Sequence, residues 1–340
     1  MQTALFDYHL PPELIAQEPA RPRSASRLLV LDRATGACAH RGFVDVLDYV
    51  REGDVFVFND SRVIRAKLRG RRADTGGKID FLLLRELSPR CWEALARPAK
   101  RAAPRRVFLF GDGELTATVL ERGSEGLVRL QLDCEGDVLQ VLEGVGEVPL
   151  PPYIKRPLSN PGDYQTVYAR SPGSVAAPTA GLHFVPELLE SLQVRGVELR
   201  FVTLHVGLGT FRPIHTESLQ DHLMHEESVS VSAETAAAIQ LARQEGRRVV
   251  AVGTTAVRTL ETIAQTGEVR EFDGRTNLFI WPGYEFTAVD ALLTNFHLPK
   301  STLLVLVSAF AGREKTLKAY AEAVAQRYRF YSFGDAMLIV

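Results

Sequence analysis

Apolar residues along this chain follow two patterns, and the first is typical of strands that alternate with helices. Consecutive apolar residues at 55–58 and 249–252 predict strands that are buried on both faces of a sheet. Residues 27–31 predict another short strand, whereas residues 44–50 and 234–245 have the spacing of helices. Strands and helices in this order predict an α/β domain.

The second pattern lies between residues 66 and 148, where apolar and polar residues alternate in short stretches. Turns rich in glycine or charge, such as Gly111-Asp112-Gly113, separate these stretches. Short strands at this spacing predict a small antiparallel barrel or sandwich. We therefore expect an α/β main domain of residues 1–65 and 149–340 with an inserted small antiparallel β-barrel domain of residues 66–148. The predicted strands are residues 79–84, 91–96, 107–110, 115–120 and 127–132.

The most apolar run of the chain is residues 303–310. It is much shorter than the roughly 20 residues that a membrane-spanning helix needs, so it predicts a buried strand and no membrane partner. Residues 279–284 predict a strand and a turn, and residues 320–338 predict a helix with a short closing segment.

The composition is that of an ordinary soluble globular protein. The chain has 340 residues, of which 46% are apolar and 24% charged, and its formal net charge is −1. A charge so close to zero gives no global field that attracts nucleic acid, so RNA binding must use local patches. Cys38, Cys91 and Cys134 form neither a disulfide framework nor a zinc pattern, and the first residues lack the apolar segment of a signal peptide. We therefore expect a cytoplasmic protein.

Two runs of basic side chains lie in the predicted insert and in the residues just before it. Basic side chains neutralise phosphates and release counterions, which supplies much of the affinity for nucleic acids. Charge runs also solvate the face of a domain, and both interpretations stay open on the residues alone. The runs are Arg62, Arg65, Lys67, Arg69, Arg71 and Arg72, and Arg97, Lys100, Arg101, Arg105 and Arg106.

The candidate active site lies in residues 175–212, where two loops rich in glycine and threonine flank a predicted helix and strand. The first loop contains His183 and the second contains His205. Functional groups often lie on loops that a rigid scaffold holds. Glycines in both loops lack a Cβ, which lets a ligand approach the backbone closely. These glycines are Gly181, Gly207 and Gly209.

Further polar residues follow the predicted strands, where open α/β sheets bind ligands. Asp60 and Arg62 follow one strand, although they could also pair with each other or cap the next element. Thr254 and Thr255 begin a helix whose free amides could bind an anion, and simple capping explains them equally well. Tyrosine and amide side chains that could contact a planar base or pack in the core are Tyr164, Gln165 and Tyr168, and donors that could bind a substrate are Asn295, His297 and Lys300.

His222 and His225 lie beside Glu226 and Glu227, which raises the question of a metal site. Their spacing is not that of the His-Glu-x-x-His motif, and no thiolates accompany them. We expect no metal here and a substrate-contacting or solvated cluster instead.

Blocks across nearly the whole chain, taken in order, resemble one family: the S-adenosylmethionine:tRNA ribosyltransferase-isomerases of queuosine biosynthesis. No single block is specific, but the ordered set is. The chain departs from the family pattern at Ser61, where threonine is expected, and at Glu226, where serine is expected; both keep a hydrogen-bonding group. The blocks are FDYHLPPELIAQ, VFNDSRV, GGKIDFLLL, PLPPYI, YQTVYA, VAAPTAGLHF, TLHVGLGTF, AVGTTAVRTLE, TNFHLPKSTLL, SAFAG and YRFYSFGDAML.

The resemblance implies a reaction and its partners. The ribosyl part of S-adenosylmethionine passes to a 7-aminomethyl-7-deazaguanine base at the wobble position of tRNA. Epoxyqueuosine forms, and adenine and methionine are released. The resemblance also implies an α/β main domain with an inserted β-barrel, S-adenosylmethionine as co-substrate and no metal. We expect no permanently bound cofactor and a monomer.

This chemistry needs a base and an acid. The sulfonium acidifies the C5′ hydrogens, so a base removes a proton there, and the loss of adenine calls for an acid. Histidine titrates nearest the working pH, so we assign these roles to His183 and His205, with Asp60 orienting or replacing one of them.

Binding roles are assigned as hypotheses on the same loops, and family membership does not settle them. The ribose and adenine are assigned to Thr179, Gly181, Gly207 and Gly209, the methionine carboxylate to Thr254, Thr255 and Arg258, and the deazaguanine to Asn295 and His297, with Arg62 as a further substrate contact. The tRNA contacts are assigned to Lys67, Arg69, Arg97, Lys100 and Arg101.

Two other functions remain open from the sequence. The first is an S-adenosylmethionine-dependent transferase that acts on a small-molecule acceptor, in which case the basic insert is only a solvated face. The second is a non-catalytic RNA-binding protein, and the many His, Asp and Thr residues after predicted strands argue against it.

Overall fold

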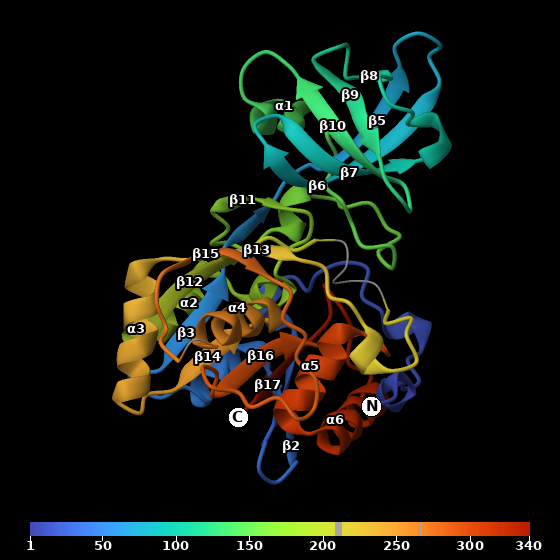
Figure 1. The fold of residues 1–340 in the computed structure, drawn as a ribbon. Coiled ribbons are helices and arrows are strands. Elements are labelled where there is room, and N and C mark those ends of the chain that lie inside the picture. Colours follow the sequence, from blue (N-terminus) through green and yellow to red (C-terminus); the bar gives the residue numbers. More distant parts are fainter. Residues whose placement is uncertain (208–212, 266) are drawn as a thin grey trace. The chain divides into compact units, whose positions relative to one another are not determined.

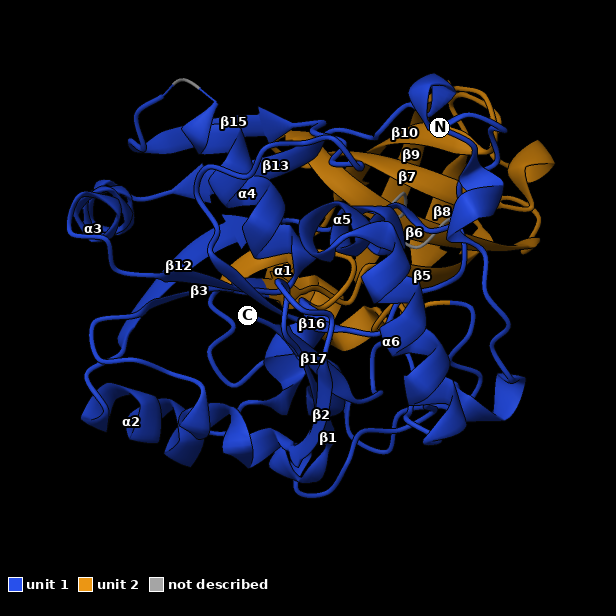
Figure 2. Ribbon diagram, turned by 90° about the horizontal axis from the view of Figure 1, so that it is seen from below, with its two compact units in different colours: residues 1–61, 152–170, 178–340 blue, residues 62–151, 171–177 orange. Residues whose placement is uncertain are grey.

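The chain folds into two compact units. The structure is a computed structural model that describes residues 1–207, 213–265 and 267–340. Unit 1 is an α/β fold and unit 2 contains a small closed antiparallel barrel, so the predicted fold class is confirmed. Unit 1 consists of Met1–Ser61, Pro152–Arg170 and Pro178–Val340, and unit 2 of Arg62–Pro151 and Ser171–Ala177 (Figure 2).

A mixed sheet forms the centre of unit 1 (Figure 1). In the described chain its strands lie in the order β15 (Phe272–Thr276), β13 (Glu227–Val231), β12 (Glu198–Leu204), β3 (Val55–Asn59), β14 (Val249–Val252), β16 (Ala291–Asn295), β17 (Ala336–Ile339), β1 (Arg27–Leu31) and β2 (Cys38–Gly42). The four strands β12, β3, β14 and β16 run parallel to one another. Their carboxyl ends therefore meet at one edge, which is where open α/β sheets bind ligands.

Helices cover both faces of this sheet because the central strands are apolar on both sides. Every residue of β3 and β14 is buried. One face packs against α2 (Pro186–Val194), and α3 (Ala233–Gln244), α4 (Thr254–Ala264) and α5 (Thr302–Ala311) lie on the other face (Figure 2). The helix α6 (Arg313–Ala325) packs against α5.

Unit 2 is built around a six-stranded closed barrel. Large apolar side chains such as Phe81, Phe108 and Phe110 alternate inward along its strands and form one core. The helix α1 (Val138–Val145) begins after Asp137, whose side chain caps it. The barrel strands are β5 (Lys67–Arg72), β6 (Lys78–Ser88), β7 (Cys91–Arg97), β8 (Val107–Phe110), β9 (Leu115–Arg122) and β10 (Leu127–Asp133). A separate ladder joins β4 (Ser61–Val63) to β11 (Ser171–Ser174).

The strand β5 coincides with the first basic run, and the sequence did not predict it. Its outward positions carry Lys67, Arg69 and Arg71, whereas Leu68 is fully buried in the barrel core. Position 70 faces the core as well, and a Cβ there would lie 2.4 Å from the ring of Phe110. Because the inward position 70 is a glycine, the strand has no alternating apolar residue after Leu68. The sequence pattern therefore resembled a run of solvent-exposed basic residues and not a strand.

Three predictions in unit 1 were wrong. The apolar run 303–310 belongs to the helix α5, which is capped by the side chain of Ser301 and buried on almost every side. A continuous apolar run has no period that separates a buried helix from a buried strand. Residues 279–284 form no strand. The helix predicted for the tail, residues 320–338, ends at Ala325, and the strand β17 follows it.

The helix predicted at residues 44–50 is a 3₁₀ helix, Phe43–Asp48. In the described residues no helix is long and apolar enough to cross a membrane.

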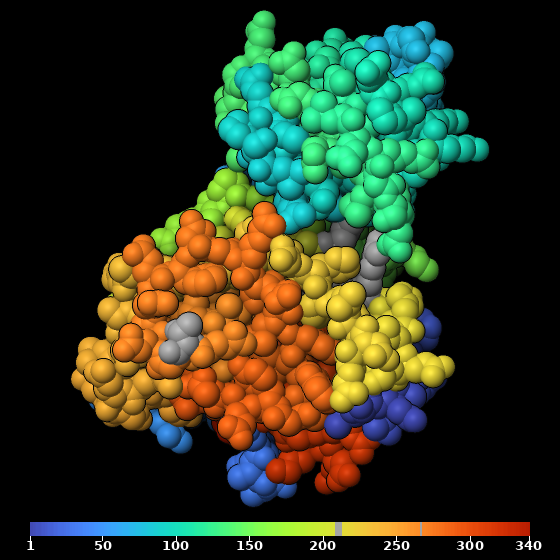
Figure 3. Space-filling view, in the orientation of Figure 1, coloured from blue at the N-terminus to red at the C-terminus, as the bar shows by residue number. Residues whose placement is uncertain are grey.

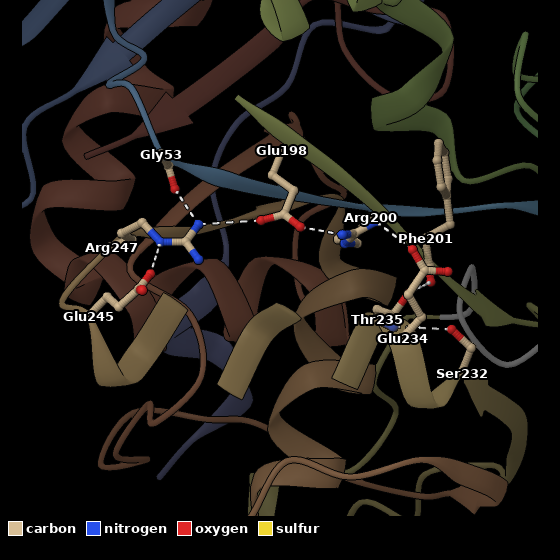
Figure 4. A network of polar contacts seen from close by, with 9 residues as sticks. All are labelled: Gly53, Glu198, Arg200, Phe201, Ser232, Glu234, Thr235, Glu245 and Arg247. Carbon is tan, nitrogen blue, oxygen red and sulfur yellow. Dashed lines mark hydrogen bonds and ion pairs between the residues drawn. The ribbon is translucent and has the colours of Figure 1, made fainter. Parts of the chain in front are cut away.

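Ion pairs close the amino-terminal edge of the parallel strands (Figure 4). Glu198 at the start of β12 contacts Arg200 and also Arg247, whose Nη1 lies 3.3 Å away. Arg200 continues to Glu234 on α3 at 2.9 Å, and Arg247 donates to the backbone oxygen of Gly53 at 2.9 Å. Charge therefore stabilises one edge of the sheet, and the opposite edge carries the candidate site.

Candidate active site

Asn59 fastens together three elements at the carboxyl edge of the sheet in unit 1. It is fully buried at the end of β3. Its side-chain nitrogen donates to the backbone oxygen of Leu204 at 3.0 Å and to Thr255 Oγ1 at 3.2 Å, and its oxygen accepts the N–H groups of Ser61 and Leu204. The ends of β3 and β12 and the start of α4 are therefore held together by one amide. Sequence reasoning assigned Asn59 no role, because nothing local distinguishes it from the polar residues that follow it.

Asp60 lies next to this amide and is almost fully buried. Thr203 Oγ1 donates to its Oδ1 at 2.7 Å, and Arg170 Nε lies 3.4 Å from its Oδ2. Arg62 belongs to unit 2, where it is exposed and pairs with Glu143 at 3.4 Å. The sequence left open that Asp60 pairs with Arg62. In the structure, Asp60 pairs with Arg170 instead.

His205 follows β12 at the same edge. Its backbone N–H donates to the oxygen of Ser228 at 3.0 Å. Its ring atom Nδ1 is shielded from solvent and has no hydrogen-bond partner among the described residues. Burial lowers the pKa of His205, and the Asp60 carboxylate opposes this only in part. The imidazole is therefore neutral at pH 7 and has a free nitrogen next to a fixed negative charge.

Tyr168 shares the environment of Asp60. Its ring packs against Phe58 and Phe201, with centroids 5.1 and 5.6 Å away. Its hydroxyl is shielded from solvent and lacks a hydrogen-bond partner in the described part of the chain. Burial, followed by the charge of Asp60, raises the pKa of Tyr168, so the phenol stays protonated. The sequence had left Tyr168 open between core packing and ligand contact, and the ring does pack, with its hydroxyl beside the backbone of Gly181.

The first glycine-rich loop forms a 3₁₀ helix, Thr179–His183, beside Tyr168. A Cβ at Gly181 would lie 1.8 Å from the Tyr168 hydroxyl, so only glycine fits there. A Cβ at Gly253, just before α4, would lie 3.6 Å from the Cβ of Ala180. The backbone of residues 180–181 therefore lies between Tyr168 and the amino terminus of α4.

His183 is buried in the core of unit 1. Asn295 Nδ2 donates to its Nε2 at 3.1 Å, and its Nδ1 lies 2.7 Å from the hydroxyl of Ser26. The ring stacks on Phe43 at 4.8 Å, and burial lowers its pKa to about 4. Both ring nitrogens are occupied and the ring is neutral, which suits a residue that holds the loop.

Asn295 and His297 are also committed to bonds inside the protein. Asn295 Oδ1 accepts from Thr179 Oγ1 at 2.8 Å, so Asn295 links Thr179 to His183. His297 Nε2 lies 2.9 Å from Thr294 Oγ1, and burial lowers its pKa to about 3. Lys300 pairs with Asp7 at 2.7 Å.

The helix α4 begins at the same edge with two buried threonines. Thr254 and Thr255 follow Gly253, whose φ of 93° lets the chain turn from β14 into the helix. Arg258 lies one turn further along and forms a buried ion pair with Glu227, a residue that sequence reasoning linked only to a metal question. Glu227 Oε1 also accepts the N–H of Gly207 at 3.0 Å. Gly209 lies outside the described residues.

His222 is half-buried and His225 is exposed. They follow a segment that pairs with the N-terminal residues through Ser218 and Gln2 (yellow against dark blue in Figure 3). His222 packs edge-on against Phe279, and burial and then His225 lower its pKa. The described residues contain no group of three side chains that could hold a metal ion.

In unit 2, strand register gathers the basic residues on one face. Arg69 on β5 lies opposite Asp80 on β6, and Asp80 lies opposite Arg97 on β7. Arg101 donates to the backbone oxygen of Lys78, which brings the second basic run onto the same strands. The members of this basic barrel face are Lys67, Arg69, Arg71, Lys78, Arg97, Lys100 and Arg101. Lys67 and Arg69 both lie within 3.3 Å of Glu147 Oε2. The seven basic residues of this face outnumber the two acidic residues named beside it, Asp80 and Glu147.

The fold is an open sheet with a barrel inserted after β3. The carboxyl edge of this sheet holds a buried carboxylate, a neutral imidazole and a helix amino terminus. Together these features define a two-unit α/β enzyme. The family model described as queuosine biosynthesis protein matches residues 3–339, so the chain belongs to that family. The family that the sequence blocks predicted is therefore confirmed.

Two relatives illustrate the match. A protein of Symbiobacterium thermophilum named S-adenosylmethionine:tRNA ribosyltransferase-isomerase is 56% identical over 341 residues, and the match covers both chains completely. The crystal structure of S-adenosylmethionine tRNA ribosyltransferase from Thermotoga maritima is similar with a TM-score of 0.59 and 42% identity, over 99% of this chain and 100% of that one.

Acid should destabilise the fold through His183 and His297. Their folded pKa values, about 4 and about 3, lie below the ordinary value of 6.5, so between pH 6.5 and 4 the unfolded chain binds protons that the folded chain does not. Stability is thus lost as the pH falls, by about 2 kcal/mol per ring between pH 7 and 5. Urea unfolding of the wild type and of His183→Gln should show that the variant loses about 2 kcal/mol less over this range. Equal losses in the two proteins would contradict the assignment.

The two glycine-rich loops should respond differently to alanine. Gly181→Ala places a methyl group against Tyr168 and should destabilise the protein by about 1–3 kcal/mol. A Cβ at Gly207 meets no atom of the described chain within 4 Å, so Gly207→Ala should change stability by less than about 0.5 kcal/mol. Thermal unfolding measures both, and loss of turnover in a fully stable Gly207→Ala protein would indicate that a ligand approaches this backbone. A Gly181→Ala protein as stable as the wild type would refute the tight contact.

Proposed function

We propose that this chain transfers and isomerises the ribosyl group of S-adenosylmethionine onto 7-aminomethyl-7-deazaguanine at the tRNA wobble position. Epoxyqueuosine-tRNA forms, with release of adenine and methionine. The observation that carries the proposal is the 56% identity, over both whole chains, to a relative named S-adenosylmethionine:tRNA ribosyltransferase-isomerase. The tRNA substrate puts the reaction in the cytoplasm, and we propose that the enzyme acts as a monomer without a permanently bound cofactor.

His205 is the base in this proposal. The positive sulfur acidifies the C5′ hydrogens of the ribose, and a neutral imidazole with a free nitrogen accepts one of them. The lowered pKa of His205 keeps it in the basic form at pH 7, and the nearby Asp60 carboxylate stabilises the imidazolium that results. The same proton is then available to the adenine as it leaves. Thr203 and Arg170 fix Asp60 for this role.

In this proposal neither Tyr168 nor His183 acts as a base: Tyr168 is a hydrogen-bond donor, and His183 is a positioning residue. The protonated Tyr168 hydroxyl, which lacks a partner in the described chain, donates a hydrogen bond to a ribose oxygen. His183 has both nitrogens occupied, so it positions the Thr179–Gly181 backbone through Asn295. Asn295 and His297 were assigned to the deazaguanine, but both side chains are already hydrogen-bonded inside the protein. In this proposal they therefore position the site and do not contact the base.

The amino terminus of α4 is proposed to bind the methionine carboxylate. The free amides and the side chain of Thr254 provide donors, and the positive end of the helix dipole favours an anion. Thr255 contributes its backbone amide, and its hydroxyl accepts a hydrogen bond from Asn59. The backbone of Thr179, Gly181 and Gly207, with Gly209, would surround the ribose and adenine.

Nucleoside mass analysis tests the reaction. The purified protein, incubated with S-adenosylmethionine and tRNA that carries 7-aminomethyl-7-deazaguanine, should convert the base to epoxyqueuosine and release adenine and methionine. His205→Gln should lower kcat by about 100-fold or more, because general base catalysis contributes on this order. His183→Gln, at a pH where it is folded, should lower kcat much less. A His205→Gln protein with wild-type kcat would remove the base assignment.

The alternative that the sequence left open, a transferase for a small acceptor, is not favoured by the names of the family and the relatives. The same assay with free 7-aminomethyl-7-deazaguanine in place of tRNA distinguishes the two. Turnover of the free base that equals turnover of tRNA would favour the small acceptor.

The basic barrel face of unit 2 is proposed to bind tRNA phosphates. Arg69→Ala/Arg97→Ala should weaken tRNA binding and reduce the slope of log K against log salt by about 1 for each phosphate that is no longer neutralised. Arg129→Ala is the control, because Arg129 is an exposed arginine on the same barrel that pairs with a carboxylate, as Arg69 does, but is not a member of the basic barrel face. An unchanged salt slope in the double variant, measured by filter binding, would exclude this face.

A further inference from the structure

A buried ion pair joins α4 to β13 in unit 1, and the proposed mechanism does not use it. The side chains of Glu227 on β13 and Arg258 on α4 are 4% and 3% exposed and contact each other directly. Arg258 Nε also donates to the backbone oxygen of Leu278 at 3.1 Å. Removing two charges from water offsets much of their attraction, and apolar side chains of similar volume often stabilise a protein as well or better. Stability alone is therefore a weak explanation for this pair.

The other oxygen of the Glu227 carboxylate leads to the candidate active site. It accepts the N–H of Gly207 at 3.0 Å. Gly207 lies two residues after His205, whose own N–H donates to the backbone oxygen of Ser228, the residue after Glu227. Among the described residues, two hydrogen bonds thus tie the segment from His205 to Gly207 to β13. One tie is made by the main chain, and the other depends on the Glu227 side chain.

Arg258 sets the direction of that side chain. One carboxylate oxygen is held by the guanidinium, so the carboxylate cannot rotate without breaking a charged hydrogen bond, and the other oxygen stays directed at Gly207. Arg258 also lies one turn after Thr255, which is bonded to Asn59. The start of α4 and the His205 segment are therefore connected through buried side chains.

We propose that Glu227 is a positioning residue, which holds the Gly207 amide so that the His205 imidazole keeps its place near Asp60, and that Arg258 orients Glu227. The inference rests on the proposed function, in which His205 accepts the proton. It also reassigns Arg258, because a guanidinium that is buried against Glu227 serves the fold of the site and leaves the methionine carboxylate to the amides of α4.

Two double variants that both lack the ion pair test the proposal. In Glu227→Gln/Arg258→Met the amide oxygen still accepts the Gly207 N–H, whereas in Glu227→Leu/Arg258→Met no acceptor remains. We expect the first variant to keep kcat within about threefold of the wild type, and the second to lose about 10- to 100-fold in kcat with little change in KM for S-adenosylmethionine, because small displacements of a reacting group have effects of this size. The NMR titration of His205 should move towards its ordinary pKa only in the second variant.

A second ion pair in unit 1 provides the control for a general loss of stability. Arg248 and Asp54 pair at 2.6 Å at the amino-terminal edge of the sheet, with 17% and 2% of their side chains exposed. Asp54→Asn/Arg248→Met should lower the unfolding midpoint but leave kcat and the His205 titration as in the wild type. If Glu227→Leu/Arg258→Met fails to fold, Glu227→Asp replaces it, since the shorter side chain keeps the charge but withdraws the acceptor from Gly207.

Two results would overturn the proposal. One is a folded Glu227→Leu/Arg258→Met protein with the kcat and His205 titration of the wild type. The other is an equal loss in both double variants, which would assign the effect to the charges and not to the Gly207 tie. If the wild type itself forms no product, the proposed function fails, and the His205 titration in the two variants still decides whether Glu227 positions the imidazole.

Discussion

The parallel alignment of β12, β3, β14 and β16 is the constraint on which the candidate site depends. It brings Asn59, His205, Thr254 and Asn295, which are far apart in the sequence, to one edge. The fully bonded amide of Asn59 then fixes the spacing between two strand ends and a helix start. An unsatisfied polar group in such a buried position costs more than the net value of one hydrogen bond. The edge therefore has little freedom to change its arrangement while the sheet is intact.

The three candidate histidines differ in environment far more than in sequence context. His183 and His297 are neutral because they are buried, and their nitrogens are used by Ser26, Asn295 and Thr294. His205 is neutral as well, but it retains a free nitrogen near a carboxylate. Two glycine-rich loops with a histidine thus hold one ring whose nitrogens are both bonded and one ring with a free nitrogen, and only tertiary contacts distinguish the two.

Patterns that repeat along a single element were readable from the sequence, and contacts between elements were not. Alternation predicted five barrel strands, and apolar runs predicted β3 and β14. The same signal failed at α5, where burial on every side removes the period, and at β5, where glycine replaces a core residue beside Phe110. The edge location of Asp60, His205 and Thr254 followed from polar residues after strands. Asn59 and Glu227 were missed, because their importance lies in partners 145 and 20 residues away.

The position of β17 has a consequence for how the protein is made. This strand, which follows all others along the chain, fills the place between β16 and β1, and it pairs with both. While the chain emerges from the ribosome, the hairpin of β1 and β2 has no neighbour on its inner side, and β16 has a bare edge of its own. Unpaired edges of this kind invite association with other chains. The nascent protein therefore keeps two unpaired strand edges until β17 has been synthesised.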